Sequence, residues 1–581
     1  LLDYLAGYRP PGAAGEPPLF GPSTRPFSRW VLFLLPIAGG LVAGAIVQWF
    51  APEAEGHGTD AAIRAYHREG GRIRARVPLI KAISSAITIG SGGSAGREGP
   101  IAQIGAGFGA IVSRALRLSD RERRILMAAG MGAGVGAIFR APLAGAIFAA
   151  EVLYAEMDLE TEVIVPSILA SIVAYSVFSF AFGADPLFAT PAYGFHHPVE
   201  LVGYALLAVV VAIMGLAYIR GLYGVRDAFR RIRLPKALKP ALGGVVVGAI
   251  GLWLPSALSS SYGVCQSALR GEALPLALFA VALAKIAATS FTIGSGGSGG
   301  VFGPSMVIGA AVGGAFGSAL HAVAPTMAPH PGAFALVGMA GFFSGVASTP
   351  ISTVIMVSEM TGNYNLLVPS MWVCLLAFLL LRGHSIYEQQ LPTRADSPVH
   401  LGEMLESALQ RILVGDVLAR RSRRLPVTVP ETAGLRSVMD RFADTGLPCI
   451  PVVDDNGDLT GVVHLTTLQS VMSEQSGQLF VAADLAVPPL RVRASDSLEH
   501  AVATMVTHDR DALLVVEDAR PDRITDILTA GDVQAVWEHH IGQAGHSATA
   551  TPFSGNILAG ALRPVAALWK TARKPRPPES P

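Results

Sequence analysis

Long apolar stretches alternate with short polar segments over residues 30–381 of this chain. Six of the stretches approach the roughly 20 residues that a helix needs to cross the hydrocarbon core of a bilayer. They are residues 30–50, 161–183, 199–219, 241–258, 273–293 and 366–381. The pattern predicts an all-α protein that crosses a membrane several times.

Four further apolar stretches are interrupted by Gly, Pro and Ser, which predicts broken, tilted or re-entrant helices. They are residues 78–116, 125–150, 300–324 and 332–360. Irregular backbone at membrane depth is tolerated only where it is buried in protein or lines a wet cavity. We therefore expect these segments to surround a cavity.

The composition agrees with a membrane protein. Of the 581 residues, 51% are hydrophobic and only 15% are charged, whereas soluble domains contain about 25% charged residues. The formal net charge of +1 argues against nucleic acid as a partner. The 3 cysteines are scattered without metal-ligand spacing, so no metal site is expected.

The polar residues divide the chain into regions. Residues 1–29 are expected to form a cytoplasmic N-terminal segment, and residues 30–388 a transmembrane domain. Beyond residue 383 the composition becomes that of a soluble protein. Residues 542–581, rich in Pro, Ser and Lys, are expected to be a disordered tail.

Two clusters of basic residues predict the orientation in the membrane. One covers residues 114–124 and the other residues 220–239, and both are expected to be loops. Loops rich in Lys and Arg stay in the cytoplasm. The chain is thus expected to be an integral protein of the cell membrane, with its C-terminal soluble part in the cytoplasm.

The most informative feature is an internal repeat. Residues 81–100 and 285–304 align without a gap at an offset of 204, and Lys81 and Lys285 begin the two copies. A second repeat relates Pro142 and Glu151 to Pro350 and Glu359, at an offset of 208. Repeats whose halves carry broken apolar helices point to a transport site near the bilayer midplane.

The two repeated segments favour an anion as the transported species. Pro100 and Pro304 suit the first turn of a helix, and the N–H groups and dipole at a helix start attract negative charge. Lys81 and Lys285 would add positive charge inside the membrane, where lysine is costly and usually functional. The alternative is that both lysines snorkel at helix ends.

Glu98 is the candidate gate. The first copy of the repeat carries Arg97-Glu98 where the second carries Val301-Phe302. An ionised carboxylate beside an anion site competes with the anion for the same donors, and protonation would release it. The alternative is that Glu98 only stabilises the dipole at a helix start.

These motifs resemble those of the CLC family of chloride channels and proton/anion antiporters. The matching segments are Gly96-Arg97-Glu98-Gly99-Pro100, Gly300-Val301-Phe302-Gly303-Pro304 and Ser385-Ile386-Tyr387-Glu388. The resemblance covers roughly residues 30–390. It implies a homodimer of polytopic helical subunits, each with an inverted internal repeat and one chloride pathway, that requires no cofactor.

The resemblance also implies roles for individual residues. Glu98 would be the external gate. The anion would be bound by residues of the repeated motifs, with Tyr387 donating its hydroxyl; the expected set is His57, Gly96, Arg97, Gly99, Gly300, Val301, Phe302 and Tyr387. Lys81 and Lys285 would support the site electrostatically.

Two departures from the family pattern bear on the mechanism. Where the family typically has Gly-Ser-Gly-Ile-Pro, this chain has Gly-His-Gly-Thr-Asp, so His57 takes the place of an anion-binding serine. His57 can donate a hydrogen bond and titrate near neutral pH, or it can be a loop residue that does not face the ion. Val152 stands at the position of the proton-relay glutamate found in many antiporters, and valine carries no proton. The intact motifs argue against the fluoride-exporting branch.

The soluble region contains two similar halves with short strands and amphipathic helices. They resemble tandem CBS domains, at residues 410–475 and 482–541. In many proteins such domains bind ATP, ADP or AMP. Thr529 and Asp532 match nucleotide-binding positions, whereas Thr467 replaces the aspartate in the first half. The alternative is that the pair serves only folding and dimer contact.

These observations predict a dimeric, Glu98-gated chloride conductor, channel-like or weakly coupled to protons, with regulatory CBS domains. A proton/chloride antiporter of the same fold is the nearest alternative. A nucleotide sensor that does not conduct is the second. An enzyme acting on a phosphorylated substrate lacks paired carboxylates or a metal cluster at suitable spacing, so no enzymatic activity is expected.

Overall fold

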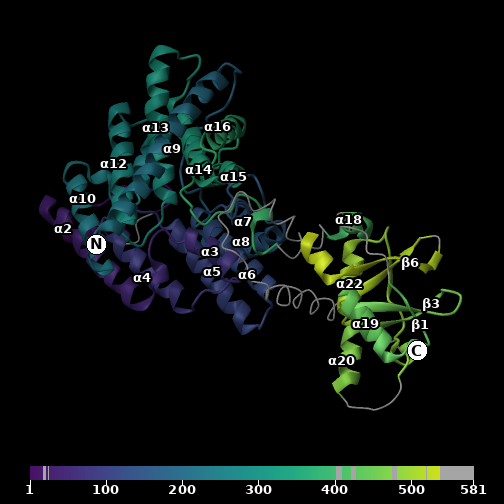
Figure 1. Ribbon diagram of the computed structural model, residues 1–581. Coiled ribbons are helices and arrows are strands. Elements are labelled where there is room, and N and C mark those ends of the chain that lie inside the picture. Colours follow the sequence, from purple (N-terminus) through teal and green to yellow (C-terminus); the bar gives the residue numbers. More distant parts are fainter. Residues whose placement is uncertain are drawn as a thin grey trace, which may run out of the picture. The chain divides into compact units, whose positions relative to one another are not determined.

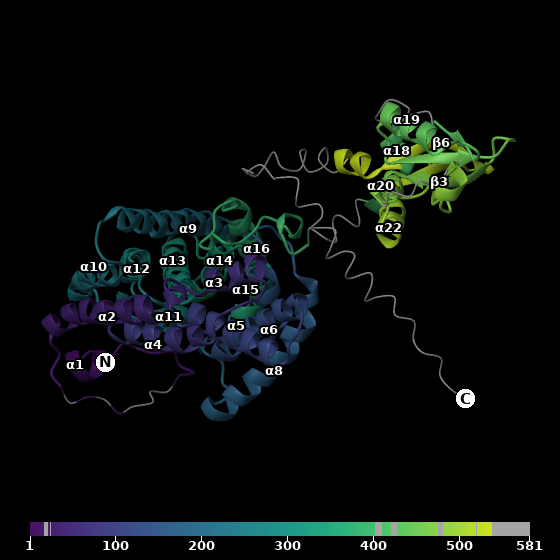
Figure 2. The same cartoon turned by 60° about the horizontal axis from the view of Figure 1, so that its bottom comes forward.

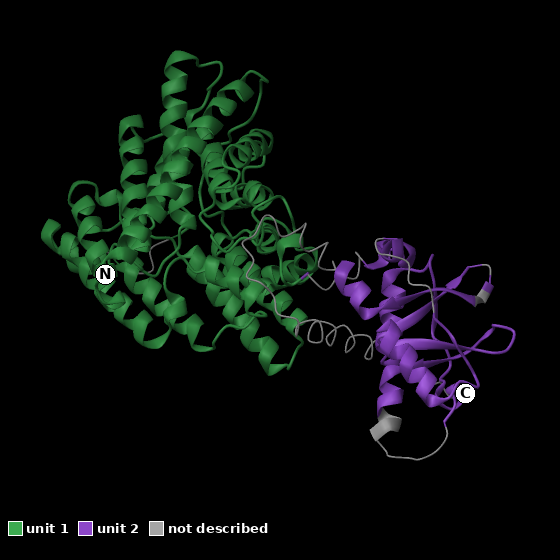
Figure 3. Ribbon diagram, viewed as in Figure 1, with its two compact units in different colours: residues 1–399 green, residues 400–581 purple. Residues whose placement is uncertain are grey.

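The computed structural model describes residues 1–16, 21, 23, 25–400, 409–419, 427–473, 480–518 and 520–536. The described chain divides into two compact units, Leu1–Val399 and His400–Pro581 (Figure 3). The first unit is helical, and the second is a small α/β unit (Figure 1). The tail at residues 542–581 lies outside the described residues.

Figure 2 shows the helices of the first unit from a second side. The α-helices are α1 (Leu2–Ala6), α2 (Arg29–Phe50), α3 (Thr59–Arg68), α4 (Arg76–Gly90), α5 (Glu98–Ala115), α6 (Asp120–Phe139), α7 (Pro142–Glu151), α8 (Thr161–Phe182), α9 (Glu200–Arg231), α10 (Lys239–Trp253), α11 (Tyr262–Arg270), α12 (Pro275–Gly294), α13 (Phe302–Val323), α14 (Pro331–Ala347), α15 (Pro350–Thr361) and α16 (Leu367–Leu380). Short 3-10 helices are η1 (Pro52–Ala54), η2 (Lys236–Leu238), η3 (Pro255–Ala257) and η4 (Arg394–Asp396).

Six described helices are long and apolar enough to cross a membrane: α2, α8, α9, η2 with α10, α12 and α13. The predicted span at residues 366–381 forms the shorter apolar helix α16. The predicted breaks are confirmed in three of the four stretches, because α4 and α5 share one interrupted stretch, as do α6 and α7, and α14 and α15. The fourth stretch, residues 300–324, forms the single unbroken helix α13.

The sequence repeat becomes a repeat of helices. The segment from η1 to α8 corresponds element by element to the segment from η3 to α16. Within the first copy α5 packs on α6, and α6 packs on α7 and α8; within the second α13 packs on α14, and α14 packs on α15 and α16. The repeat therefore extends well beyond the 20 residues that align without gaps.

Equivalent glycines allow equivalent helices to approach closely. A Cβ atom added at Gly105 would overlap the carbonyl of Gly130 between α5 and α6. In the second copy, a Cβ at Gly309 would meet the carbonyl of Gly338 between α13 and α14. Small residues at such contacts permit tight packing in a membrane, where the hydrophobic effect does not drive helices together.

Burial separates the interior helices from the peripheral ones. Every residue of α14 from Gly332 to Ala347 is buried. In contrast, α8 buries only Val163, Ser167 and Ser171, although it is strongly apolar. An apolar helix that leaves most of its surface uncovered is suited to lipid or to a second membrane subunit.

The second basic cluster is mainly helical. Arg220, Arg226, Arg230 and Arg231 lie in the last turns of α9, a helix of 32 residues. The prediction of a loop over residues 220–239 was wrong for this part. A basic residue in the last helical turn interacts favourably with the negative end of the helix dipole, which suits these arginines to a helix end.

The direction of α2 conflicts with the prediction that residues 1–29 and the second basic cluster both lie in the cytoplasm. Phe33, near the start of α2, packs on Gly248 near the end of α10. The loop after α2 lines a cavity together with Arg226 and Arg230. A helix that crosses the membrane puts its two ends on opposite sides, so residues 1–29 and this basic cluster cannot both be cytoplasmic. If the basic cluster is cytoplasmic, the N-terminal segment lies on the outer side.

The second unit consists of two three-stranded sheets with one topology. Its strands are β1 (Val429–Pro430), β2 (Cys449–Val453), β3 (Leu459–His464), β4 (Arg491–Arg493), β5 (Ala512–Glu517) and β6 (Arg520–Thr529). Its helices are α18 (Val414–Ala419), α19 (Leu435–Thr445), α20 (Leu465–Ser473), α21 (Ala482–Leu485) and α22 (Leu498–His508). In each sheet the middle strand pairs parallel with the first strand and antiparallel with the third. The expected twofold similarity of this region is confirmed.

The two halves of the second unit exchange their first helices. Val414 and Val417 of α18 are buried in the core of the second half, whereas Ala482 and Leu485 of α21 are buried in the core of the first half. A third cluster joins the two sheets. The halves therefore share their cores. The expected ranges 410–475 and 482–541 describe the repeat in the sequence, but they are not two separate folding units.

Candidate functional site

The starts of α5 and α13 meet in the interior of the first unit. Gly96 donates its N–H to Gly300 at 2.8 Å, and Gly300 donates to Gly96 at 2.7 Å. Such reciprocal bonding between equivalent residues is what a two-fold axis between the repeats produces. Because the first-turn N–H groups of a helix have no partner within the helix, both helix starts direct positive partial charge into the same region.

Glu98 is the first residue of α5, and its carboxylate reaches across to α13. Its Oε2 accepts the N–H of Gly303 at 3.1 Å, and its Oε1 accepts a hydrogen bond from the Tyr262 hydroxyl. The residue is 1% exposed. A Cβ at Gly96 or Gly303 would collide with this carboxylate, so glycine at these two positions creates the space that Glu98 occupies.

Arg97 directs its guanidinium away from the helix starts. It forms an ion pair with Glu16 of the N-terminal segment and lies over the ring of Tyr262, at 5.5 Å from the centroid. Its Nε lies 3.9 Å from Oε1 of Glu98. Arg97 is thus a neighbour of Glu98, with its strongest contact to Glu16.

The two repeated lysines hold equivalent loops. Lys81 donates to the carbonyls of Ala54 and Gly56 at 3.0 and 2.6 Å. Lys285 donates to the carbonyls of Ala257 and Ser259 at 3.2 and 2.5 Å, and to the hydroxyl of Ser261 at 2.9 Å. Both lysines have no exposed surface. Their ammonium groups therefore do not snorkel, and each fixes the loop that precedes a short helix.

His57 and Tyr387 come together although 330 residues separate them in sequence. Their ring centroids lie 5.5 Å apart. The Nδ1 atom of His57 and the hydroxyl of Tyr387 are buried, and neither has a hydrogen-bond partner within the part of the chain that the structure describes. Buried polar atoms normally find partners, so two unpaired ones side by side are suited to a small polar ligand.

A cavity of about 330 Å³ reaches His57 from the side of the basic cluster. Its charged lining consists of Glu53, Glu55, Asp60, Arg64, Arg226, Arg230 and Glu388. His57 also lines it, with Nε2 at 3.9 Å from Oδ2 of Asp60. The lining thus holds four carboxylates and three arginines, and Arg226 forms ion pairs with Glu388 and Asp227, so the cavity carries no excess of positive charge.

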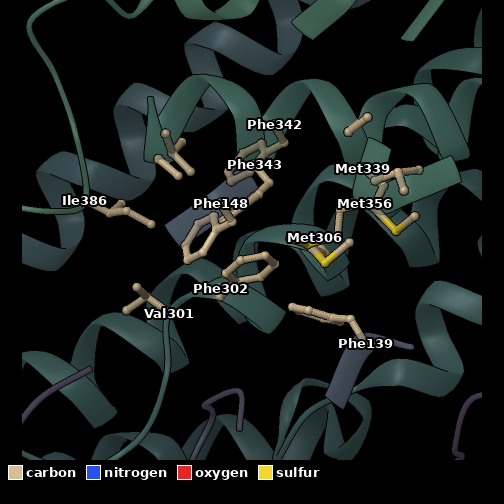
Figure 4. Packing of buried hydrophobic residues seen from close by; sticks show 14 of the residues in the cluster. Phe139, Phe148, Val301, Phe302, Met306, Met339, Phe342, Phe343, Met356 and Ile386 are labelled. Atoms are coloured by element: carbon tan, nitrogen blue, oxygen red, sulfur yellow. The ribbon is translucent and has the colours of Figure 1, made fainter. Parts of the chain in front are cut away.

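Val301 and Phe302 can offer the site only their backbone. The Phe302 ring packs against the rings of Phe139, Phe148 and Phe343 in an apolar cluster (Figure 4). The carbonyl of Val301 accepts hydrogen bonds from Ser305 at 2.7 Å and from Tyr218 at 3.3 Å. The cluster and these bonds fix the start of α13.

The position expected for a proton relay is apolar. Val152 is fully buried just after α7. The neighbouring Glu151 accepts N–H groups of Ile351 and Ser352, each at 2.8 Å. In return, Glu359 accepts the N–H of Ala144 at 3.0 Å. Glu151 of α7 therefore caps the start of α15, and Glu359 of α15 caps the start of α7. Both have a structural role.

In the second unit, Thr529 and Asp532 lie together at the end of β6. The carboxylate of Asp532 accepts the N–H of Thr529 at 2.9 Å and its hydroxyl at 2.7 Å. Thr529 and Asp532, which the sequence analysis matched to nucleotide-binding positions, are thus bonded to each other in the turn that follows β6.

Sequence reasoning missed the tyrosine that binds Glu98. Tyr262 begins α11, just as Thr59 begins α3, so the repeat relates these positions. The Pro-x-Ala sequence shared by Pro52–Ala54 and Pro255–Ala257 marks the relation at an offset of 203, one residue less than the offset of the lysines, so the ungapped repeat did not reveal it. Ser84 and Ser298, joined across the repeats at 2.9 Å, were also missed, because they lie at non-equivalent positions of the aligned segments.

The chain is similar to proteins named as chloride transporters. The profile of the family described as "Voltage gated chloride channel" matches residues 39–382, and that of the "CBS domain" matches residues 414–474. A "Putative chloride channel protein ClcB-like" of Ralstonia nicotianae is 31% identical over 386 residues, which cover 65% of this chain and 90% of the relative.

Another relative bears the name of an exchanger. The "H(+)/Cl(-) exchange transporter ClcA" of Cronobacter sakazakii is 32% identical over 378 residues, covering 62% of this chain and 79% of the relative. Among solved structures, a slow cyanobacterial Cl⁻/H⁺ antiporter aligns with a TM-score of 0.57 and 25% identity, over 63% of this chain and 87% of that one. The names of the relatives thus include both a channel and exchangers.

Proposed function

The chain belongs to the voltage-gated chloride channel family, the CLC family, and we propose that it conducts chloride through a pore in each subunit that Glu98 gates. The observation that carries this proposal is the position of the Glu98 carboxylate. It accepts the Gly303 N–H at the start of α13, where the helix dipole would otherwise attract an anion. The carboxylate therefore blocks the place that chloride would take.

The pathway continues to His57 and Tyr387. Their unpaired Nδ1 and hydroxyl would each donate a hydrogen bond to chloride, provided that the histidine tautomer carries its proton on Nδ1. The cavity that His57 lines gives access to this site. Chloride is the expected ion because the relatives are named for it.

We propose conduction that is channel-like or only weakly coupled to protons. Val152 cannot carry a proton, and the nearby Glu151 is engaged by three donors of α15. A proton-coupled exchanger is the second candidate, favoured by the exchange transporter of Cronobacter sakazakii and the cyanobacterial antiporter.

The proposal includes a homodimer in the cell membrane, with the second unit in the cytoplasm as a regulator. The uncovered apolar face of α8 is suited to lipid or to the second subunit. An adenine nucleotide is proposed to bind near Thr529 and Asp532, which calorimetric titration with ATP, ADP and AMP tests. No heat of binding at millimolar nucleotide would leave the second unit with a purely structural role.

The gate is tested with the purified protein in liposomes, by recording chloride efflux and proton movement together between pH 4.5 and 8. Wild-type flux should rise as the pH falls, because protonation releases Glu98 from its donors. Glu98→Gln should give a high flux that no longer depends on pH. A pH-dependent flux that persists in Glu98→Gln would contradict the gate. Uphill proton movement in the wild type would establish the exchanger.

A further inference from the structure

The contact between Glu98 and Tyr262 joins the two halves of the repeat. Tyr262 is the first residue of α11 and is 2% exposed. Its hydroxyl donates to Oε1 of Glu98, while Gly303 donates to Oε2. Each carboxylate oxygen therefore has its own donor, one from a side chain and one from a helix start.

The ring of Tyr262 is held on two sides. Phe188 packs against it edge to face, with centroids 5.6 Å apart, and the Arg97 guanidinium lies over it at 5.5 Å. Arg97 is itself held by Glu16. An added Cβ at Gly303 would lie 3.0 Å from the Tyr262 hydroxyl, so the absence of a side chain there leaves room for it. The hydroxyl is thus kept in place whether or not Glu98 is bound to it.

The N-terminal segment contributes to this arrangement. Gly263, which follows Tyr262, donates its N–H to the carbonyl of Pro11 at 3.0 Å. Ala14 donates to the side chain of Gln266 on α11 at 3.2 Å. Residues 11–16 therefore fasten the start of α11 and bring Glu16 to Arg97.

We propose that Tyr262 is a positioning residue that holds Glu98 in its blocking position, and that it thereby sets the pH at which the pore opens. This inference rests on the proposed gating role of Glu98. A hydrogen bond from a neutral hydroxyl to an ionised carboxylate is stronger than one between neutral groups, especially away from water. The Tyr262 hydroxyl therefore stabilises the closed, ionised gate more than the protonated one.

Other charged or titratable groups surround Glu98 and set the background of this effect. Arg97 lies beside it, the buried Lys285 of α12 is bound to Ser261 next to Tyr262, and Tyr387 packs against His57. His57 touches the start of α5 with its backbone carbonyl, at Gly99. None of these groups changes when the Tyr262 hydroxyl alone is removed.

Tyr262→Phe is the decisive variant, because it keeps the ring and removes only the donor. Chloride efflux from liposomes is measured against pH. The pH of half-maximal flux should shift upward by about one unit, the size expected for one charge-assisted hydrogen bond. Flux at pH 8 should rise several-fold, because the ionised gate is held less firmly. A pH profile equal to that of the wild type would overturn the proposal.

Tyr154→Phe is the matched control. Tyr154 is also buried, and its hydroxyl donates to the buried Glu160 at 2.7 Å. This variant loses the same kind of bond outside the proposed pathway, so its profile should equal that of the wild type. An equal upward shift in both variants would mean a general loosening of the fold, which contradicts a specific role of Tyr262.

A second pair of variants separates this inference from the gate itself. In the Glu98→Ala background there is no carboxylate for Tyr262 to hold, so adding Tyr262→Phe should leave the flux unchanged. A further increase would mean that the hydroxyl acts elsewhere, and would overturn the proposal. If instead wild type and Glu98→Ala conduct equally at every pH, the gating function fails, independently of the result for Tyr262.

Discussion

The two halves of the first unit share one arrangement of helices and differ in the side chains at the helix starts. Lys81 and Lys285 occupy equivalent positions, are equally buried, and hold equivalent loops. The loops lead into α3 and α11. The symmetric residues therefore hold equivalent loops in the two halves, and the extra hydrogen bond from Lys285 to Ser261 is the main difference between them.

The asymmetric residues carry the chemistry that we propose. Glu98 begins α5, whereas Phe302 begins α13 and packs into an apolar cluster. Thr59 begins α3, whereas Tyr262 begins α11 and binds Glu98. One half thus supplies the titratable gate, and the other supplies both of its hydrogen-bond donors, Tyr262 and Gly303. In our proposal, divergence at a few positions of the repeat is therefore enough to produce a gate.

The largest effect should come from the shared scaffold. Replacing either lysine by Met keeps the length of the side chain but leaves buried acceptors without a donor, at about 1–3 kcal/mol for each acceptor. Lys285→Met loses a donor to three acceptors and Lys81→Met to two. Both variants should lower the melting temperature in detergent, Lys285→Met more.

The control for the lysines is Lys236→Met, at an exposed position, which should melt as the wild type does. If both buried lysines tolerate Met without a change in melting temperature, the loops are held by packing alone. The two lysines would then not be an equivalent structural element of the two halves.

An intermediate effect should distinguish the two repeated glutamates. Glu151 accepts three hydrogen bonds from Ile351 and Ser352, and a glutamine offers only one oxygen to them. Glu151→Gln should therefore cost about 2 kcal/mol of stability, and Glu359→Gln, with a single bond to Ala144, less than about 1 kcal/mol. Thermal unfolding in detergent measures both.

Flux measurements on the same glutamate variants test whether either residue takes part in conduction. Neither residue belongs to the proposed pathway, so the pH dependence of chloride flux should remain that of the wild type. Loss of that dependence in Glu151→Gln would instead make Glu151 a proton carrier next to Val152.

The sequence predicted the scaffold well, because repetition and apolar length are local properties. The breaks near Pro100 and Pro142 and the burial of Lys81 follow from such patterns. The partners of Glu98 and Arg97 could not be predicted in the same way. Tyr262 lies outside the aligned segment, and Glu16 stands in a polar segment without a pattern, so only the folded chain brings them to the gate.

The smallest effect should come from His57, the one departure in the first loop that faces the proposed ion. Counted from the starts of α3 at Thr59 and α11 at Tyr262, His57 lies opposite Ser260, so serine is compatible with this loop geometry. In His57→Ser a hydroxyl replaces the larger imidazole, whose Nδ1 lacks a partner among the described residues. We expect the chloride-to-nitrate flux ratio to change by about 3- to 10-fold, the equivalent of roughly one hydrogen bond. The exposed His384→Ser should leave the ratio unchanged. Equal ratios in His57→Ser and wild type would mean that His57 does not contact the ion.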